Sequence, residues 1–92
     1  MKAREHFIGE RNQIIDTQAT KDSAIITRAF YNETGYIIGL ERKFFSKNLL
    51  DVEVITKMVD EDVAEGFSIV DFNIDDHGQR GVFFTYYARI MR

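Results

Sequence analysis

Two β-rich runs separated by a short turn form the clearest hydrophobic pattern in the chain. AIITRAFY ends at residue 31, YIIGLERKFF begins at residue 36, and Gly35 in the turn between them can take a positive φ. This pattern predicts a β-hairpin. The predicted core face of its second arm consists of Tyr36, Ile38, Leu40 and Phe44. Arg42 interrupts that face and is expected to reach water, and Gly39 on the other face predicts a bulge or a close approach by another backbone.

A second hairpin is predicted at the end of the chain. FSIVDFNI is followed by the polar segment 75–81 and then by VFFTYYARI. Apolar and polar residues alternate in the first run, whereas both alternating rows of the last run are partly apolar, which predicts a central strand or a strand at an interface. We expect a mutually packed core that contains Ile38, Leu40, Phe44, Ile55, Val59, Phe72 and Phe84.

The segment between the hairpins, residues 46–66, has the spacing of a helix. Its apolar side chains recur at three- and four-residue steps, at Leu49, Val52, Ile55, Val59 and Val63. Ser46 or Asn48 is the expected N-cap, and Gly66 is the expected stop. Acidic residues near the C-terminus of this helix oppose its dipole, so we expect the last turn to fray or to be held by a basic partner.

The first 22 residues leave two alternatives open. They form either a short helix followed by irregular chain, or an edge strand in which Gln13 to Thr20 pairs with the first hairpin across a turn at residues 20–22. In both cases the sequence predicts a single α+β domain over residues 1–92, because no proline, linker or repeat marks a boundary. The domain is an antiparallel sheet of four or five strands with one amphipathic helix packed on one face. The first alternative adds an N-terminal helix.

Composition narrows the classes of function. The chain contains no cysteine, which excludes a disulfide scaffold, a thiol nucleophile and a thiolate zinc site and favours a cytoplasmic location. No apolar run has the length of a membrane span, so we expect no membrane partner. The net charge of −3 is unevenly divided: residues 1–47 hold eight Lys and Arg against six Asp and Glu, and residues 48–92 hold four against nine. The second half is therefore the acidic half.

No set of residues carries a signature of catalysis or of metal binding. His6 and His77 lie in different segments, and the trio of Asp75, Asp76 and His77 is interpreted as a solvated turn because it lacks the alternating ligands of a calcium loop. The serines and glycines form neither a nucleophile elbow nor a phosphate-binding loop. We therefore predict a protein that is not an enzyme and that uses no cofactor and no metal.

Two surfaces are candidates for partner binding. The first is the acidic helix, with Lys57 as its single cation and the carboxylates of Asp51, Glu53, Asp60, Glu61, Asp62 and Glu65. It is either a solvated helix face or an electrostatic docking surface for a basic partner. The second is the outer row of the last strand, continued onto a neighbouring strand, and it comprises Phe83, Tyr87, Arg89, Met91, Lys43 and Phe45.

This aromatic row has three interpretations. It belongs to the core if the first segment or a second subunit covers it, it forms a protein interface, or it stacks the bases of single-stranded nucleic acid. Nucleic acid is the least favoured because the chain lacks a concentrated basic surface. The sequence thus predicts a small regulator or inhibitor that binds a larger protein, a second copy of itself as a homodimer, or both. A single-stranded nucleic-acid-binding module is the alternative.

Overall fold

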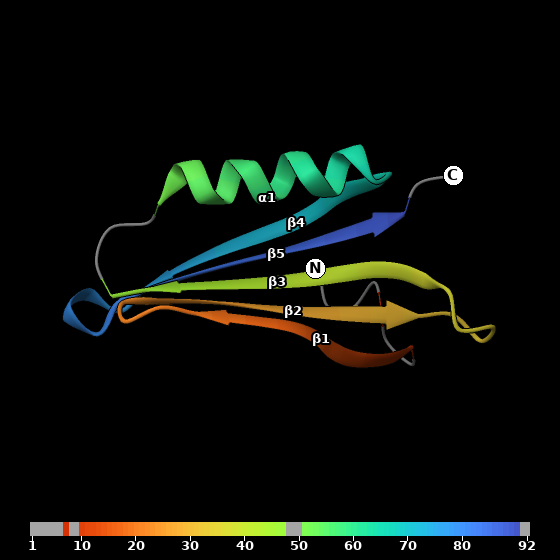
Figure 1. Ribbon diagram of the computed structural model, residues 1–92, viewed down its shortest axis with the longest axis horizontal. Coiled ribbons are helices and arrows are strands. Elements are labelled where there is room, and N and C mark those ends of the chain that lie inside the picture. The colour runs from red at the N-terminus through yellow and green to blue at the C-terminus, as the bar shows by residue number, and fades with distance from the viewer. Residues whose placement is uncertain (1–6, 8–9, 48–50, 91–92) are drawn as a thin grey trace.

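The protein folds as one antiparallel sheet of five strands with a single helix packed against it (Figure 1). The computed structural model describes residues 7, 10–47 and 51–90. The strands are β1 (Arg11–Ala19), β2 (Ser23–Tyr31), β3 (Ile37–Ser46), β4 (Phe67–Asp76) and β5 (Val82–Ile90), and the helix is α1 (Val52–Ala64). The predicted α+β fold is confirmed, with five strands. In the described part of the chain, α1 is not long and apolar enough to cross a bilayer.

The strand order is β1-β2-β3-β5-β4, so the last strand of the chain lies inside the sheet between β3 and β4. Of the two alternatives predicted for this run, a central strand or a strand at an interface, the central strand is confirmed. The first segment forms edge strand β1, which pairs with β2 and confirms that alternative over residues 11–19. A helix that extends into residues 11–19 is excluded by β1, and of residues 1–9 the structure describes only Phe7.

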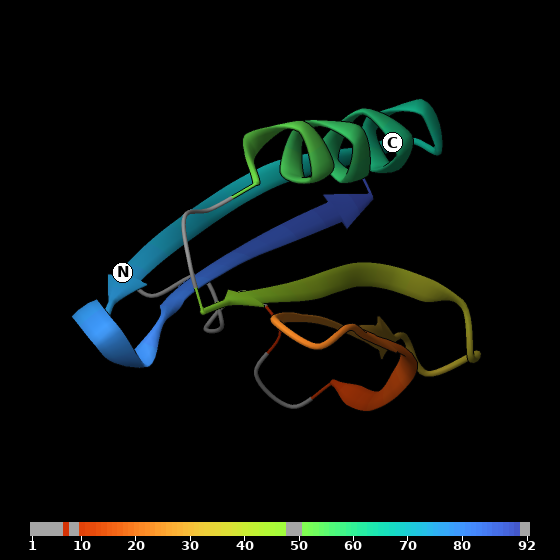
Figure 2. The same ribbon diagram turned by 60° about the vertical axis from the view of Figure 1, so that its left-hand side comes forward.

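The sheet is curved, and α1 lies over its β4 and β5 side (Figure 2). We call the face that α1 covers the concave face, and the opposite face the convex face. Registers such as Leu40 with Ala88 and Phe44 with Phe84 place the apolar side chains of neighbouring strands on the concave face. The buried core consists of Ala29, Leu40, Phe44, Met58, Phe67, Tyr86 and Ala88.

The predicted core is correct in part. Leu40 and Phe44 are buried, and Phe84, Ile55 and Val59 are partly buried against them. Phe72 was expected in the core but is 64% exposed, because it lies on edge strand β4 beyond the cover of the helix.

Ile38 was also expected in the core, and a bulge in β3 explains why it is not. Phe30 pairs with Gly39 and Tyr31 pairs with Ile37, so Ile38 is the extra residue between them. An extra residue reverses the in-and-out alternation of side chains. Ile37 therefore packs against the core in place of Ile38, and Tyr36 precedes the strand with 72% of its surface exposed.

The helix begins later than predicted. Asp51 is its N-cap, and the Asp51 carboxylate accepts a hydrogen bond from the Val54 N–H at 3.2 Å. Ser46, one of the two expected caps, instead ends β3, and the other, Asn48, lies outside the described residues. Gly66, with φ +99°, follows the helix end as expected.

The side of α1 that faces the sheet differs from the predicted apolar stripe. Val52 and Val63 are more than half exposed, whereas Val54, Ile55 and Met58 pack on the core. The stripe is therefore rotated, and the rotation carries one acidic residue of the helix inward.

Gly39 is the site of a close approach on the convex face. The ring of Phe7 stacks on Phe30, with 4.3 Å between ring centroids, and it occupies the space in which a Gly39 side chain would lie. The space beside Gly39 is closed by this ring and by the Ala88 carbonyl of the neighbouring strand, and the bulge at Ile38 is adjacent, so both predicted features are present. Both Phe7 and Phe30 are buried as a result.

Candidate functional site

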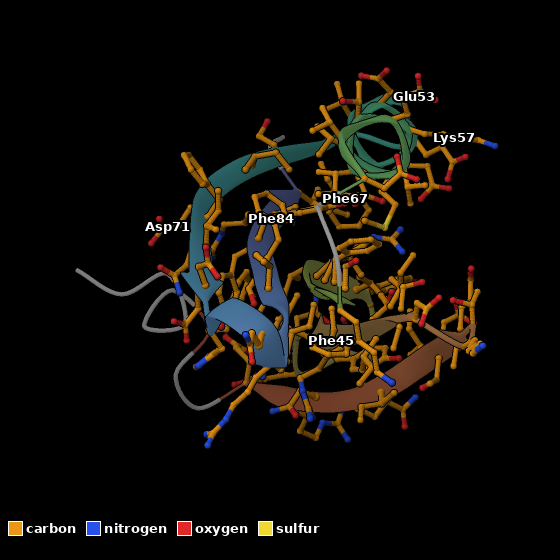
Figure 3. The ribbon with its side chains drawn as sticks, turned by 90° about the vertical axis from the view of Figure 1, so that its left-hand side faces the viewer. Phe45, Glu53, Lys57, Phe67, Asp71 and Phe84 are labelled. Carbon is orange, nitrogen blue, oxygen red and sulfur yellow. The ribbon has the colours of Figure 1, made fainter. Side chains whose placement is uncertain are left out.

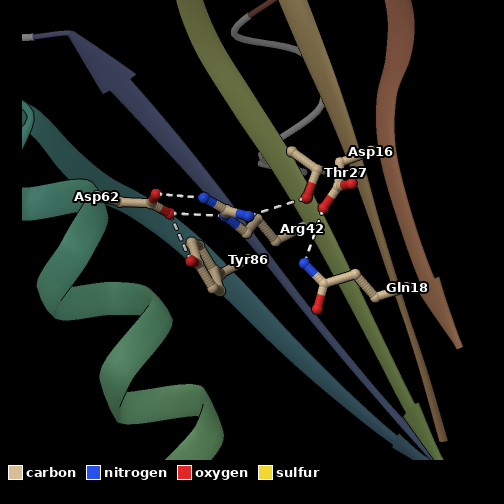
Figure 4. Close-up of polar contacts among 6 residues, drawn as sticks. All are labelled: Asp16, Gln18, Thr27, Arg42, Asp62 and Tyr86. Carbon is tan, nitrogen blue, oxygen red and sulfur yellow. Dashed lines mark hydrogen bonds and ion pairs between the residues drawn. The ribbon is translucent and has the colours of Figure 1, made fainter. Parts of the chain in front are cut away.

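A buried polar cluster joins α1 to the concave face of the sheet (Figure 4). The Asp62 carboxylate, which is fully buried, accepts hydrogen bonds from Arg42 Nε at 2.9 Å and from Arg42 Nη2 at 2.6 Å. It also accepts one from the Tyr86 hydroxyl at 2.5 Å. Arg42 Nη1 donates to Thr27 Oγ1 at 2.9 Å. The cluster thus connects the helix to β2, β3 and β5.

Arg42 and Tyr86 both keep their protons at neutral pH. The hydrogen bond and charge of Asp62 raise the pKa of Arg42, so the guanidinium stays cationic. Burial, followed by the hydrogen bond to Asp62, raises the pKa of Tyr86, so the phenol stays protonated. Across the described residues, no buried side-chain nitrogen or oxygen lacks a hydrogen-bond partner. The cluster therefore has all its hydrogen bonds made within the chain. We call its four residues, Thr27, Arg42, Asp62 and Tyr86, the clamp, because they fix the position of the helix.

The position of Asp62 differs from the one predicted for it on the acidic surface of the helix. Asp62 was assigned to the acidic docking face, but it lies on the inner side of α1. Two signals in the sequence pointed to this arrangement: Arg42 interrupts an apolar row of β3, and Asp62 follows Met58 by four residues and Ile55 by seven. Four- and seven-residue steps place side chains on one helix face. Arg42, which was expected to reach water, is instead paired with Asp62, so the last turn of the helix is held by a cation of its own chain.

A pocket of about 290 Å³ adjoins the clamp on the concave side. Its lining comprises Ile15, Asp16, Thr27, Ile37, Leu40, Arg42, Glu65 and Phe67. The Thr27 hydroxyl in this pocket accepts a hydrogen bond from Arg42. The Asp16 carboxylate accepts from Gln18 at 3.0 Å. Arg42 and Asp16 thus already have partners within the chain.

The turn between β4 and β5 carries the trio considered in the sequence. His77 Nε2 lies 3.1 Å from Asp75 Oδ2, and the His77 ring meets the Phe83 ring edge-on. The Asp76 carboxylate accepts the Gly78 N–H at 2.8 Å, which braces the turn itself. Within residues 7, 10–47 and 51–90, no group of three or more His, Cys, Asp or Glu side chains is arranged to hold a metal ion.

The outer face of α1 is strongly acidic. Figure 3 shows Glu53 and Lys57 projecting from the helix away from the sheet. The other exposed carboxylates of the predicted helix surface are Asp51, Asp60, Glu61 and Glu65. We call these five acidic residues, with Lys57 as their only cation, the acidic helix face. Strand β4 carries three more carboxylates, Asp71, Asp75 and Asp76, of which Asp71 and Asp75 lie on the convex face rather than beside the helix. Lys57 is the only Lys or Arg among residues 51–76, which hold nine Asp and Glu.

The predicted aromatic row lies on the convex face, where it is partly covered. Phe45 and Phe83 are in contact, with ring centroids 4.8 Å apart, and Phe83 is 42% exposed. The Arg89 guanidinium lies 5.7 Å from the centroid of the Phe7 ring, so Phe7 adjoins that end of the row. Lys43 is exposed and Tyr87 is half-buried, and Met91 lies outside the described residues.

Comparisons of the chain with protein-family models, with curated proteins and with solved structures found no match. The class of the protein is defined by its fold and its site. It is an α+β protein in which the Arg42–Asp62 ion pair joins a five-stranded antiparallel sheet to one acidic helix.

Proposed function

We propose that this chain is a non-enzymatic binding protein that docks on a larger protein through the acidic helix face. The observation that carries the proposal is the set of five exposed carboxylates on α1 with Lys57 as their only cation. Clustered charge of one sign accelerates encounter with a partner of opposite charge and selects its orientation. The matching partner surface is rich in Lys and Arg.

The clamp inside the protein supports this proposal. Asp62 and Arg42 fix the C-terminal half of α1 to the sheet, and Asp51 caps its other end. Charges on a fixed helix keep their mutual spacing, which reduces the ordering cost of binding. A small domain that docks in this way acts by occupying or holding a surface of its partner, as a regulator or inhibitor does.

Affinity capture with a charge-neutralised helix tests the proposal. The parent chain and the triple variant E53Q/D60N/E61Q are immobilised, and proteins retained from a lysate of the source cells are identified and quantified. The acidic helix face predicts a stoichiometric partner with a basic surface that the parent retains and the variant loses at moderate salt.

A matched control carries the same change of charge on the β1–β3 half of the molecule. The variant D16N/D22N/E33Q alters three exposed acids there and is expected to retain the partner. Equal retention by all three chains would assign binding to another surface. Failure of the parent to retain any stoichiometric partner would contradict the proposed function.

A further inference from the structure

Within the part of the chain that the structure describes, no strand pairs with the outer edge of β4. This strand forms one margin of the sheet, with β5 on its inner side. The His77 N–H donates to the Gly81 carbonyl at 2.9 Å, so at this end of the ladder the His77 N–H points toward β5. Bonded and non-bonded pairs alternate along such a ladder, so Phe72 and Ile74 direct their N–H and C=O groups to the free edge. In agreement, the Phe72 N–H donates to its neighbour Asp71 Oδ1 at 2.8 Å.

The side chains at this edge alternate in character. Phe72 and Ile74 lie on the concave side and are 64% and 53% exposed. Asp71 and Asp75 lie on the convex side, and Figure 3 shows Asp71 projecting away from Phe84. A strand paired with this edge would place side chains opposite each of these residues. Apolar residues would cover Phe72 and Ile74, and cations would face the two aspartates.

A second copy of the chain does not meet these requirements. Pairing β4 with β4 of a second copy would add a second set of aspartates beside Asp71, Asp75 and Asp76, and like charges at close cross-strand positions are destabilising. The other edge strand, β1, carries a single cation, Arg11, which cannot pair with two aspartates. The charge pattern therefore selects a different chain.

We propose that the β4 edge accepts an extended segment of a partner protein as a sixth strand, with the pattern Lys or Arg, apolar, polar, apolar, Lys or Arg. Main-chain hydrogen bonds to the N–H and C=O of Ile74 and to the C=O of Phe72 supply affinity in this mode, since the Phe72 N–H already donates to Asp71 Oδ1. The alternating side chains supply specificity. This inference rests on the proposed function in one respect, namely that the chain binds protein. It uses a different surface from the acidic helix face.

The test uses a labelled synthetic peptide whose core is Lys-Val-Thr-Val-Lys and a control peptide of the same composition in which the two Lys and the two Val are adjacent. Fluorescence anisotropy measures the binding of both peptides to the full chain. If charge alone determines binding, the two peptides bind with equal affinity. If the peptide adds as a strand, the affinity of the alternating peptide is about tenfold or more higher.

Two proline variants locate the binding edge. Ile74→Pro removes an N–H that points away from β5, a change that edge strands tolerate. It is expected to lower the affinity for the alternating peptide by about tenfold. Thr17→Pro is the matched control on β1, since the Thr20 N–H to Ser23 carbonyl bond places the Thr17 N–H at the free edge of that strand. It is expected to leave binding unchanged. Circular dichroism checks that both variants keep the fold.

The outcomes separate this inference from the proposed function. Equal binding of the two peptides, no measurable binding of the alternating peptide, or retention of its affinity by Ile74→Pro would overturn strand addition at β4. None of these results bears on capture of a partner by the acidic helix face, because that capture is tested separately with the variant E53Q/D60N/E61Q. Conversely, loss of the preference for the alternating peptide in Ile74→Pro, with capture unaffected by the helix variant, would support the edge and contradict the helix.

Discussion

Replacing Asp62 by Ala is expected to cost a large share of the stability of this protein. The substitution removes the acceptor of two hydrogen bonds from Arg42 and one from Tyr86. Removal of one partner from a buried ion pair costs about 3 to 5 kcal/mol, because the remaining charge stays uncompensated. The Arg42 side chain is 18% exposed and can recover some hydration, so we expect a loss near the lower limit, about 3 kcal/mol.

Urea unfolding followed by far-UV circular dichroism measures this loss. A protein of this size has a free energy of unfolding on the order of 5 to 15 kcal/mol, so the midpoint should shift strongly while the slope stays unchanged. Asp60→Ala is the control, because Asp60 is exposed on the same helix and its replacement should change stability by no more than about 0.5 kcal/mol. An Asp62→Ala midpoint equal to that of Asp60→Ala would refute the clamp.

Three further predictions test other parts of the structure. Burial raises the pKa of Tyr86 above its ordinary value of 10.0. The Tyr86 hydroxyl therefore contributes fully to the free energy of unfolding below about pH 10, and this contribution decreases as the pH rises further. Urea midpoints between about pH 8 and pH 11 should fall less steeply for Tyr86→Phe than for the parent. Gly39→Ala should lower the free energy of unfolding by about 1 to 3 kcal/mol because its methyl group would overlap the ring of Phe7, and thermal melts should show a smaller effect of the same change in a Phe7→Ala background. Replacing Phe83 and Tyr87 together by Ser should weaken self-association in sedimentation without unfolding the chain, whereas loss of oligonucleotide binding alone would favour the nucleic-acid alternative.

The fold was predictable from the sequence where the pattern is local. Alternation over eight to ten residues around a Gly turn identifies a hairpin, and steps of three and four identify α1, because each pattern reflects the geometry of one element. The failures also have local causes. The single extra residue at Ile38 exchanges two side chains between faces, and nothing in the run YIIGL marks which of its isoleucines is the extra one.

The candidate site was predictable only in part, because it depends on how the elements meet. The acidity of the helix is a property of the sequence, and five of its six predicted residues are exposed. The burial of Asp62 depends on its position opposite Arg42, a contact between residues 20 positions apart. The open edge of β4 depends on β5 lying inside the sheet, which alternation along single strands does not determine.

The association rate constant for the captured partner tests the central claim most directly. It should be measured for the parent chain and for E53Q/D60N/E61Q at about 0.05 M and about 0.5 M salt, because screening weakens the attraction between exposed charges. The acidic helix face predicts that the parent associates about tenfold or more faster than the variant at low salt, and that the two rates converge at high salt. Equal rates for the two chains at low salt would contradict the claim that this face guides binding.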